Sequence, residues 1–502
     1  MPMEKTFIPF GGSYITRDFD AYNSTDSARD PVTYGFMPIK IENALTGKQT
    51  VYVDKAPAFD RVQTTVGSYY GGDLKVWQGM NATPGQYIIS SWADASVRAG
   101  TAFTNAKFYY GSVSIGTVTF GAAEGIYSYI SECLLAGTSN IIFAIEKNTA
   151  TSLVAYHYPE GGALTQITTI PTNCVGNFVH LNGYSFILAK DGKIYNSTLN
   201  DVSAGYTDFT SADSLNDRGV GLARLGNSIA AVGQESIEVF TIVENATGSP
   251  LQKQLSIVIE MGGVAAKSIV EAANAIYFFG QARGSGAIGI FKLDSNFKLE
   301  KISTPFIDRF FLPNFEAVNS RRAPILSSTA WAGKEQILAC SPSAQTGGKT
   351  WSYDVETGSW WEPPKGSAII VEGTSLLGIP YVTVDSSSAG GVEHISHSVG
   401  LTYNTNNLII TSPITFDTEN LKTFEYLQLK GVAGTATNNI SIAWSDDYGY
   451  TWSSSRTVNL ASGFTRISGL GAARHRMFRF ISSSTTPCRL EGFELGYTIG
   501  SS

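Results

Sequence analysis

Short apolar segments alternate with polar turns at a nearly constant interval between residues 125 and 402. One apolar position in each segment serves as an anchor, and six anchors follow one another: Ile141, Tyr184, Ile229, Ile276, Ile337 and Tyr381. Their successive spacings are 43, 45, 47, 61 and 44 residues. A period of about 40–45 residues is typical of a β-propeller blade with four strands. The pattern therefore predicts a propeller of about six blades over residues 125–402.

Two stretches inside the repeat look like blade hairpins. In WSYDVETGSWWEPP, we expect Tyr353-Asp354 to end one strand, Gly358 to form the turn, and Trp360-Trp361 to begin the next strand. The glycine-rich stretch 280–289 lacks the following helix and Lys-Ser/Thr of a phosphate-binding loop, so a hairpin is favoured there too. The long fourth interval predicts an insertion after Phe306 that projects from one face. A stacked β-solenoid is the rival architecture, but its repeat would be shorter and more regular.

The two flanks of the repeat follow other patterns. Residues 1–124 do not share the period, and they are interpreted as an irregular N-terminal platform with a hairpin turning at Thr46-Gly47-Lys48. Residues 403–502 contain a hairpin and an alternating segment, Met477–Phe480, that is typical of a half-buried strand. These features predict a C-terminal antiparallel β-sandwich. The chain as a whole is expected to be all-β, with the propeller at 125–402.

The composition favours strands, and the net charge limits the kinds of partner that the surface can bind. The chain is 43% hydrophobic and 15% charged, with 51 Gly, 24 Tyr and 27 Phe, which favours strands and tight turns. A formal charge of −7 argues against a surface that grips nucleic acid, because such a surface needs clustered Lys and Arg. The charge does not exclude DNA as cargo, since a weakly acidic wall lets a polyanion slide without binding it.

No targeting or metal-binding pattern stands out. The start of the chain lacks an apolar core of signal-peptide length, and no stretch approaches the roughly 20 apolar residues of a membrane span. Cysteines that are far apart and form no CxxC pair are interpreted as buried small hydrophobic residues in a reducing compartment; they are Cys133, Cys174, Cys340 and Cys488. We expect no membrane anchor and assembly in a cytoplasm.

The stretch SDDYGYTW at 445–452 carries the most specific motif. Its spacing S-x-D-x-G-x-x-W resembles the Asp box of sialidases and other glycan-active propellers, and it is formed by Ser445, Asp447, Gly449 and Trp452. In sialidases the boxes repeat around the propeller beside an arginine trio and a Tyr/Glu pair. Here the only full box lies outside the repeats. We therefore expect a structural turn, in which Asp447 accepts backbone N–H bonds, Gly449 takes positive φ and Trp452 folds under the turn.

Two further groups are weaker candidates. His394 and His397 lie three residues apart in a strand-like setting and have no third ligand, so ordinary surface histidines are favoured over a metal site. The segment 472–479 concentrates Arg474, His475, Arg476 and Arg479. A phosphate contact is one interpretation, and a solvated or subunit-facing edge is the favoured one. The sequence thus predicts no catalytic, cofactor-binding or metal-binding residues, and no cofactor.

Taken in order, several segments resemble the packaged-DNA stabilisation proteins, also called tail hubs or nozzles, of short-tailed bacteriophages. The similar segments are YGFMPIKIENALTGKQTVYVDKAPAFD near the start, LARLGNSIAAVGQESIEVFTI at 222–242, MGGVAAKSIVEAANAIYFFG at 261–280, and DDYGYTW, LGAARHRMFRF and LEGFELGYTI near the end. The resemblance spans nearly all 502 residues. The chain departs from the family pattern in its full Asp box and its long fourth interval.

The resemblance implies a non-enzymatic structural protein of the virion tail. Such proteins form a ring, usually a hexamer, below the portal and its adaptor. They extend the DNA channel without sequence-specific contact, help to retain packaged DNA, and carry fibres, spikes or a tail needle. The alternatives are a glycan-binding or glycan-cleaving propeller, such as a phage receptor-binding protein, and a generic propeller scaffold.

Overall fold

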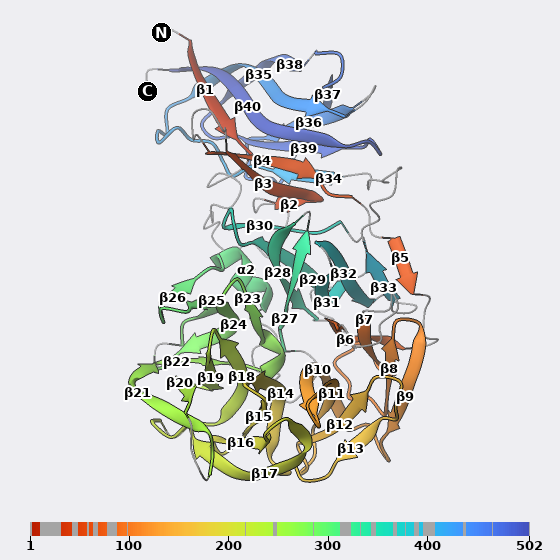
Figure 1. Cartoon of the computed structure of the whole chain (residues 1–502). Helices are drawn as coiled ribbons and strands as arrows, with labels where there is room; N and C mark the ends of the chain where they lie inside the picture. The colour runs from red at the N-terminus through yellow and green to blue at the C-terminus, as the bar shows by residue number, and fades with distance from the viewer. Residues whose placement is uncertain are drawn as a thin grey trace.

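The computed structural model describes residues 3–10, 32–42, 49–57, 60–63, 69–77, 88–97, 99–215, 217–243, 248–284, 286–311, 323–331, 333–342, 348–364, 369–376, 378–385, 391–394, 407–434, 438–463 and 465–500. Within these residues the regular structure is almost entirely β, with one short helix, α2 (Pro305–Phe311), and one 3-10 turn, η1 (Ala266–Ser268). The all-β prediction is confirmed. Figure 1 shows two bodies, a propeller and a smaller two-sheet sandwich at its rim.

The propeller consists of seven antiparallel sheets, which we number as blades in chain order. Blades 1 to 4 are β6 (Tyr70–Val76), β7 (Ile88–Ala93), β8 (Asn105–Tyr110), β9 (Val113–Thr119); β10 (Gly125–Leu135), β11 (Thr138–Lys147), β12 (Leu153–Pro159), β13 (Thr165–Ile167); β14 (Cys174–Leu181), β15 (Tyr184–Ala189), β16 (Lys193–Thr198), β17 (Asp201–Ser211); and β18 (Gly219–Leu225), β19 (Ser228–Gly233), β20 (Ile237–Ile242), β21 (Leu251–Ile259).

The remaining blades vary this four-stranded plan. Blade 5 has a split inner strand, and blade 7 takes its outer strand from the N-terminal part of the chain. Blades 5 to 7 are β22 (Met261–Gly263) and β23 (Ile269–Ala272), β24 (Ala275–Ala282), β25 (Ile288–Asp294), β26 (Leu299–Lys301); β27 (Ile325–Trp331), β28 (Lys334–Ser341), β29 (Lys349–Asp354), β30 (Ser359–Trp361); and β31 (Ile369–Leu376), β32 (Ile379–Asp385), β33 (Gly391–His394), β5 (Asp60–Gln63).

The seven blades form a closed ring. The innermost strand of each blade contacts that of the next, and β31 of blade 7 contacts β6 of blade 1. Within blade 7, β5 pairs with β33, so that His394 lies opposite Asp60. This pairing joins segments about 330 residues apart, and it fastens the last blade to the chain that leads into the first. The predicted propeller is confirmed, with one blade more than the repeat indicated.

The sandwich is built from both ends of the chain. Its first sheet, sheet A, contains β1 (Glu4–Pro9), β3 (Phe36–Glu42), β4 (Gln49–Lys55), β35 (Lys422–Ala433), β38 (Arg466–Ala473) and β40 (Cys488–Ile499). The second, sheet B, contains β2 (Val32–Tyr34), β34 (Asn407–Ile410), β36 (Asn439–Ser445), β37 (Arg456–Asn459) and β39 (Met477–Ser482). Apolar side chains of both sheets, including Phe493 and Phe480, form one core between them. The propeller is therefore an insertion between β4 and β34.

Sandwich and propeller meet at blade 6. The Gly35 N–H donates to the Glu362 carbonyl (2.8 Å), and the Glu362 N–H donates to the Thr33 carbonyl (2.7 Å). Beneath this bridge the rings of Trp331 and Trp361 pack edge to face, 4.9 Å apart, and both are buried with Met37 and Ala56. Backbone hydrogen bonds and a shared apolar cluster together make this joint a rigid one.

The first 124 residues are organised differently from the predicted platform. Strands β1 to β4 belong to the sandwich, β5 completes blade 7, and β6 to β9 form blade 1. The boundaries at 124/125 and 402/403 thus do not separate three independent units. The physical reason is that strands from the two chain ends hydrogen-bond to each other, as in β1 with β40. The β3–β4 hairpin is present, but its turn at Thr46-Gly47-Lys48 lies outside the described residues.

Several local predictions within the repeat can be checked. β29 ends at Asp354 and pairs with β30 from Ser359, with Gly358 at φ +68°, so the predicted hairpin is confirmed. The stretch 280–289 joins β24 to β25 as a hairpin, as expected. The four cysteines are all buried and free.

The sequence predicted an insertion after Phe306 that projects from one face. This prediction is wrong for the described part of the insertion. Helix α2 packs into the core between blades 5 and 6, where Phe306 meets the ring of Trp351 and Phe311 meets Phe279. The apolar side chains of the helix account for this, because exposing them to water would be unfavourable.

Candidate functional site

The centre of the propeller holds a polar cavity of about 380 Å³, lined by residues from all seven inner strands. On these strands the earlier residues are apolar and buried, whereas the later residues line the cavity. Ile126 precedes Glu132 on β10, Ile325 precedes Ser328 on β27, and Ile369 precedes Thr374 on β31. The space inside the ring of inner strands, which we call the channel, is thus filled by apolar side chains at one end. At the other end it is lined by polar side chains.

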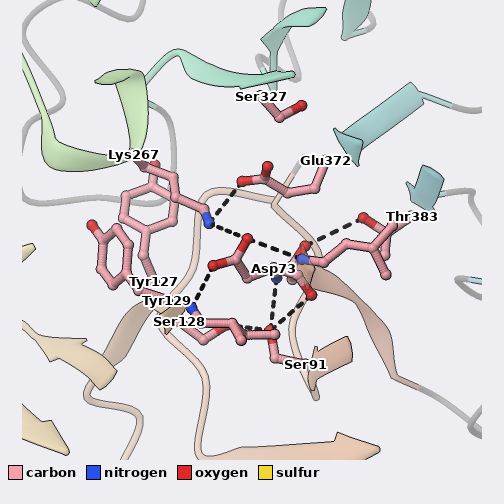
Figure 2. Close-up of polar contacts among 12 residues, drawn as sticks. Asp73, Ser91, Tyr127, Ser128, Tyr129, Lys267, Ser327, Glu372 and Thr383 are labelled. Atoms are coloured by element: carbon pink, nitrogen blue, oxygen red, sulfur yellow. Dashed lines mark hydrogen bonds and ion pairs between the residues drawn. The ribbon is translucent and has the colours of Figure 1, made fainter. Parts of the chain in front are cut away.

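Lys267 lies at the floor of this cavity and joins three blades. Its Nζ lies 2.7 Å from Glu372 Oε1 of blade 7 and 3.2 Å from Asp73 Oδ1 of blade 1. Figure 2 shows the lysine reaching from its own blade between the two carboxylates. The ring of Tyr129, from blade 2, lies 5.0 Å from the same Nζ. We call Lys267, Asp73 and Glu372 the central brace.

Hydrogen bonds from the backbone fix Asp73 within the brace. The Leu74 N–H donates to Asp73 Oδ1 (2.9 Å), and the Ile130 N–H donates to Asp73 Oδ2 (2.6 Å). The Asp73 N–H in turn donates to Ser91 Oγ (2.7 Å), which lies 2.7 Å from Ser128 Oγ (Figure 2). Asp73 therefore ties blades 1 and 2 together while it holds Lys267.

Burial sets the protonation of the brace. It raises the pKa of Glu372 to about 8, with Lys267 opposing the shift and Asp73 adding to it. Burial by itself would lower the pKa of Lys267, but the two carboxylates outweigh it and raise that pKa above its ordinary value. The lysine is therefore charged at neutral pH, and it faces Asp73 together with a Glu372 carboxyl that is mostly protonated below pH 8.

The 3-10 turn η1, which carries Lys267, fits inside the channel because two glycines leave room for it. The inner strand of blade 5 breaks between β22 and β23, and η1 fills the break. A Cβ on Gly176 would lie 2.8 Å from Ala266 Cβ, and one on Gly221 would lie 3.2 Å from it. Only glycine at these positions of blades 3 and 4 lets η1 approach so closely. Within the described residues, η1 thus lies inside the ring of inner strands, where it contacts β14, β18 and β27.

The three residues of the brace were not predicted from the sequence. Asp73 falls in the region interpreted as a platform, and Lys267 falls in the quoted segment MGGVAAKSIVEAANAIYFFG. The available signal was a lone lysine within an otherwise apolar run, which is costly to bury unless it is paired. Its two partners cannot be identified from sequence, since they are brought to it only by closure of the ring.

The Asp-box residues meet in one turn of the sandwich, far from the brace in the chain. Ser445 Oγ donates to Asp447 Oδ1 (2.7 Å) and accepts from the Gly449 N–H (2.8 Å). Asp447 also accepts from the N–H (2.9 Å) and the hydroxyl (2.6 Å) of Thr451. Gly449 has φ +88°. Partial desolvation pushes the pKa of Asp447 upward, but the hydrogen bonds from Thr451 and Ser445 hold it below its ordinary value.

Trp452 lies differently from the expected position under the turn. Its side chain is only partly buried, and the Arg479 guanidinium lies 4.5 Å from the centroid of its ring. The tryptophan thus contacts β39 through a cation–π interaction and does not fill the space beneath the box.

The basic segment 472–479 joins β38 to β39, and most of its basic side chains pack against the Asp-box turn. Arg476 is 1% exposed, and its Nε and Nη2 donate to Asp446 Oδ1 and Oδ2 at 2.6 and 2.7 Å. The ring of His475 stacks on Tyr448 at 3.9 Å. Among the four residues named from sequence, only Arg474 is exposed. The expectation of an outward-facing edge is therefore wrong for Arg476, because a bidentate carboxylate pair and aromatic rings compensate its burial.

Other chemistry finds little support in the described part of the chain. No group of three His, Cys, Asp or Glu there is arranged to hold a metal ion. His394 ends β33, and His397 lies outside the described residues. The same search region contains no helix with the length and hydropathy needed to span a bilayer. A retaining glycosidase needs two carboxylates about 5 Å apart; Lys267 pairs with Asp73 and Glu372, and Glu132 and Glu271 also line the cavity.

A family model provides the most informative comparison with known proteins. The model of the phage stabilisation family, described as bacteriophage P22 Gp10, beta-propeller, matches residues 94–359. This range runs from the end of β7 to the start of β30 and therefore covers most of the propeller. No curated protein sequence matches the chain.

Three of the solved structures that match the chain do so with low TM-scores. BBS1N in complex with ARL6DN is 8% identical, with 67% of this chain and 99% of that chain covered and a TM-score of 0.36. The designed protein Ika8 is 11% identical, with 67% and 100% covered and a TM-score of 0.33. YCF48 bound to D1 peptide is 8% identical, with 68% and 96% covered and a TM-score of 0.37. At these scores the structures carry no argument about function.

Proposed function

The chain belongs to the phage stabilisation family of bacteriophage P22 Gp10 and is a structural tail protein of a phage, and on this basis we propose that it is a subunit of the tail nozzle, or hub. Copies of the chain, six by family analogy, form a ring below the portal and its adaptor. The ring extends the DNA channel, helps to retain packaged DNA, and docks fibres, spikes or a needle. The family match over residues 94–359 is the observation that carries this proposal.

The closed centre of the propeller constrains how such a ring conducts DNA. Among the described residues, the apolar end of the channel and η1 leave no path through a single subunit. The lumen of the nozzle must therefore lie between subunits, on the symmetry axis of the ring. In this arrangement the propeller is a rigid wall element, and its stiffness comes from ring closure and from the central brace.

The distribution of charge supports a conduit that does not grip its cargo. Residues 58–402 contain 21 Lys and Arg and 28 Asp and Glu, so the whole formal charge of −7 belongs to the propeller segment. The remaining residues, which include the sandwich, are neutral in sum. An acidic wall repels phosphates over roughly a Debye length, about 8 Å at physiological salt, and thereby favours sliding over sticking.

The proposal assigns no catalytic step to the chain. The paired carboxylates of the brace are held by Lys267 and backbone N–H groups, and the single Asp box is held by its own hydrogen bonds. The function is mechanical, with assembly in the host cytoplasm and a final place in the virion tail. Partners are other copies of the chain, the adaptor and the fibre, spike or needle proteins.

Reconstitution tests the proposal. Purified full-length chain is mixed with portal–adaptor complexes of the same phage and imaged by negative stain. We expect a closed ring, seated on the adaptor, that is absent when the chain is omitted. Particles lacking this chain should lose packaged DNA faster than complete ones. A chain that stays monomeric and unattached, or that hydrolyses sialosides, would sink the nozzle assignment.

A further inference from the structure

The outer face of sheet A, away from sheet B, carries exposed side chains on β1, β35 and β38. The core-facing side chains, such as Ile8, Leu427 and Phe493, point toward sheet B, so their sequence neighbours face outward. The central strand β40 has glycines at two outward positions. A Cβ on Gly496 would collide with the ring of Tyr426 at 2.2 Å, and one on Gly492 would lie 2.8 Å from Phe7 Cζ. The two rings therefore lie across β40.

Apolar side chains are exposed on this face at several points. Met3 and Phe7 on the β1 side are each 47% exposed, Leu421 before β35 is 51% exposed, and Val432 on β35 is 59% exposed. Alternation along β1 and β35 places Phe7 and Val432 on the outer side of the sheet, and Met3 and Leu421 directly precede these two strands. Four large apolar groups on or beside one sheet face are more than the scattered single residues of an ordinary surface.

Cations outnumber anions around the two rings. In the strand register, Lys5 lies opposite Gly496 and Lys430 opposite Gly492, and the Arg466 guanidinium lies 3.7 Å from the centroid of the Tyr426 ring. These three cations surround Glu494, whose Oε1 accepts from the Tyr426 hydroxyl at 2.5 Å. Three cations thus surround Glu494, and one further exposed carboxylate, Glu425, lies next to Tyr426 in β35.

The rim of blade 3 has the opposite character. Its outermost strand, β17, has no further neighbour within the described part of the sheet. Phe209 on this strand is 46% exposed, and Leu199 just before it is 55% exposed. Carboxylates outnumber lysines there, four to two; the groups are Asp191, Asp201, Asp208 and Asp213 with Lys193 and Lys253. Asp208 itself is exposed.

We propose that the outer face of sheet A binds the β17 rim of a second copy of this chain, so that copies join head to tail. Each surface presents exposed apolar side chains, and the excess charge of one is opposite in sign to that of the other. Figure 1 shows β17 at the end of the propeller away from the sandwich. Two different surfaces at opposite ends form a heterologous contact, which generates a closed ring when the rotation between copies closes. This inference rests on the proposed ring and names its contact.

Duplex DNA is the rival occupant of the basic face. Three cations on one sheet could approach phosphates, but a phosphate backbone offers nothing to Met3, Leu421 and Val432, whose exposure is then unexplained. A protein surface with its own apolar groups and carboxylates accounts for both features at once. The second copy is therefore favoured.

Charge exchange tests the contact on the full-length chain. The variants are Lys430→Glu, Asp208→Lys and the double variant, with Lys298→Glu as a matched control at an exposed lysine of blade 5. Sedimentation velocity over a range of concentrations measures self-association. Each single reversal should weaken association by about tenfold or more. The double variant should return to within about threefold of the wild type, because the exchanged charges again face each other. The control should match the wild type.

Several outcomes would overturn the proposal. One is unchanged association of Lys430→Glu, and another is a double variant as weak as the single ones. A third comes from fluorescence anisotropy with duplex DNA: if Lys430→Glu loses DNA binding while self-association persists, the face contacts DNA. Equal melting temperatures of all variants would show that misfolding is not responsible for a loss.

The ring itself is tested separately. If portal–adaptor complexes still carry rings made from Lys430→Glu or Asp208→Lys, this contact is wrong and the nozzle function stands. If the wild-type chain forms no ring on those complexes, the nozzle function fails and the contact fails with it. The two failures are therefore distinguishable.

Discussion

Lys267 of the propeller and Arg476 of the sandwich are both buried cations that pair with carboxylates, and they differ in reach. Lys267 spans the centre of the propeller and joins blades 1 and 7 to its own blade 5. Arg476 joins the Asp-box turn to β39, which is already the neighbour of β36 in the same sheet. The first cation therefore closes a ring, whereas the second only fastens a turn to the sheet that carries it.

The partners of the two cations differ as well. Glu372 is nearly inaccessible, with a side chain that is 4% exposed, whereas the side chain of Asp446 is 41% exposed. A carboxylate that loses its partner in water is hydrated again, but one that loses its partner in the interior is not. The comparison teaches that equally buried cations can have unequal importance, because the burial of the partner sets the cost of separation.

Removing Lys267 should have the largest effect. Lys267→Met leaves Asp73 and Glu372 buried without their cation, and we expect a loss of about 3–5 kcal/mol in the free energy of unfolding, measured in urea. The double variant Lys267→Met/Glu372→Leu should recover part of this loss, since it leaves only Asp73 without the cation, and Asp73 keeps the hydrogen bonds from the Leu74 and Ile130 N–H groups. A loss below about 1 kcal/mol for the single variant would mean that the brace does not stabilise the ring.

Removing Arg476 should cost less. Arg476→Ala loses a bidentate pair and the packing of the guanidinium on Phe424, and we expect about 2 kcal/mol by the same measurement. Arg474→Ala is the matched control, because Arg474 is exposed and should change the free energy by roughly 0.5 kcal/mol or less. If Arg476→Ala proved as costly as Lys267→Met, the contrast between the two cations would be lost.

The pH dependence of stability should reveal Glu372. Its pKa is raised to about 8 in the folded chain from an ordinary value of 4.5, so the folded state holds this proton more tightly. The resulting stabilisation is complete below about pH 4.5 and is lost as pH rises toward 8. Relative to Glu372→Gln, the wild type should lose up to about 1.4 kcal/mol per pH unit in this window. Parallel curves for the two proteins would contradict the assignment.

The Asp-box turn should show the smallest effect. Asp447→Ala removes the acceptor of two hydrogen bonds from Thr451, and we expect about 1 kcal/mol of destabilisation and weaker ring assembly. Asp447→Asn, which keeps one acceptor oxygen, should fall between this variant and the wild type. Loss of a sugar-cleaving activity with unchanged stability would instead assign the turn to catalysis.

The sequence was informative wherever contacts are local. Strands of one blade are neighbours in the chain, so the anchors from Ile141 to Tyr381 mark six blades correctly. Blade 1 was missed because residues 1–124 were interpreted as a platform, although its equivalent position, Ile89, lies only 52 residues before Ile141. The spacing of the Asp box likewise identified a turn in which Ser445, Asp447 and Gly449 meet, whereas Trp452 contacts Arg479 instead.

Long-range contacts left no comparable signal. Glu4 pairs with Tyr497, and Asp60 with His394, but no pattern in either segment names the other. The same holds for the brace, because Asp73, Lys267 and Glu372 come together only when seven blades close. A family resemblance supplied the function, since neither the repeat nor the Asp box specifies a phage tail.

Reconstruction of the assembled virion tail by cryo-electron microscopy tests the central claim most directly. We predict a closed ring of this chain below the adaptor, with DNA density on the ring axis and the centre of every propeller closed by η1 and Lys267. DNA density inside a propeller, or isolated copies at the tips of fibres, would contradict the account.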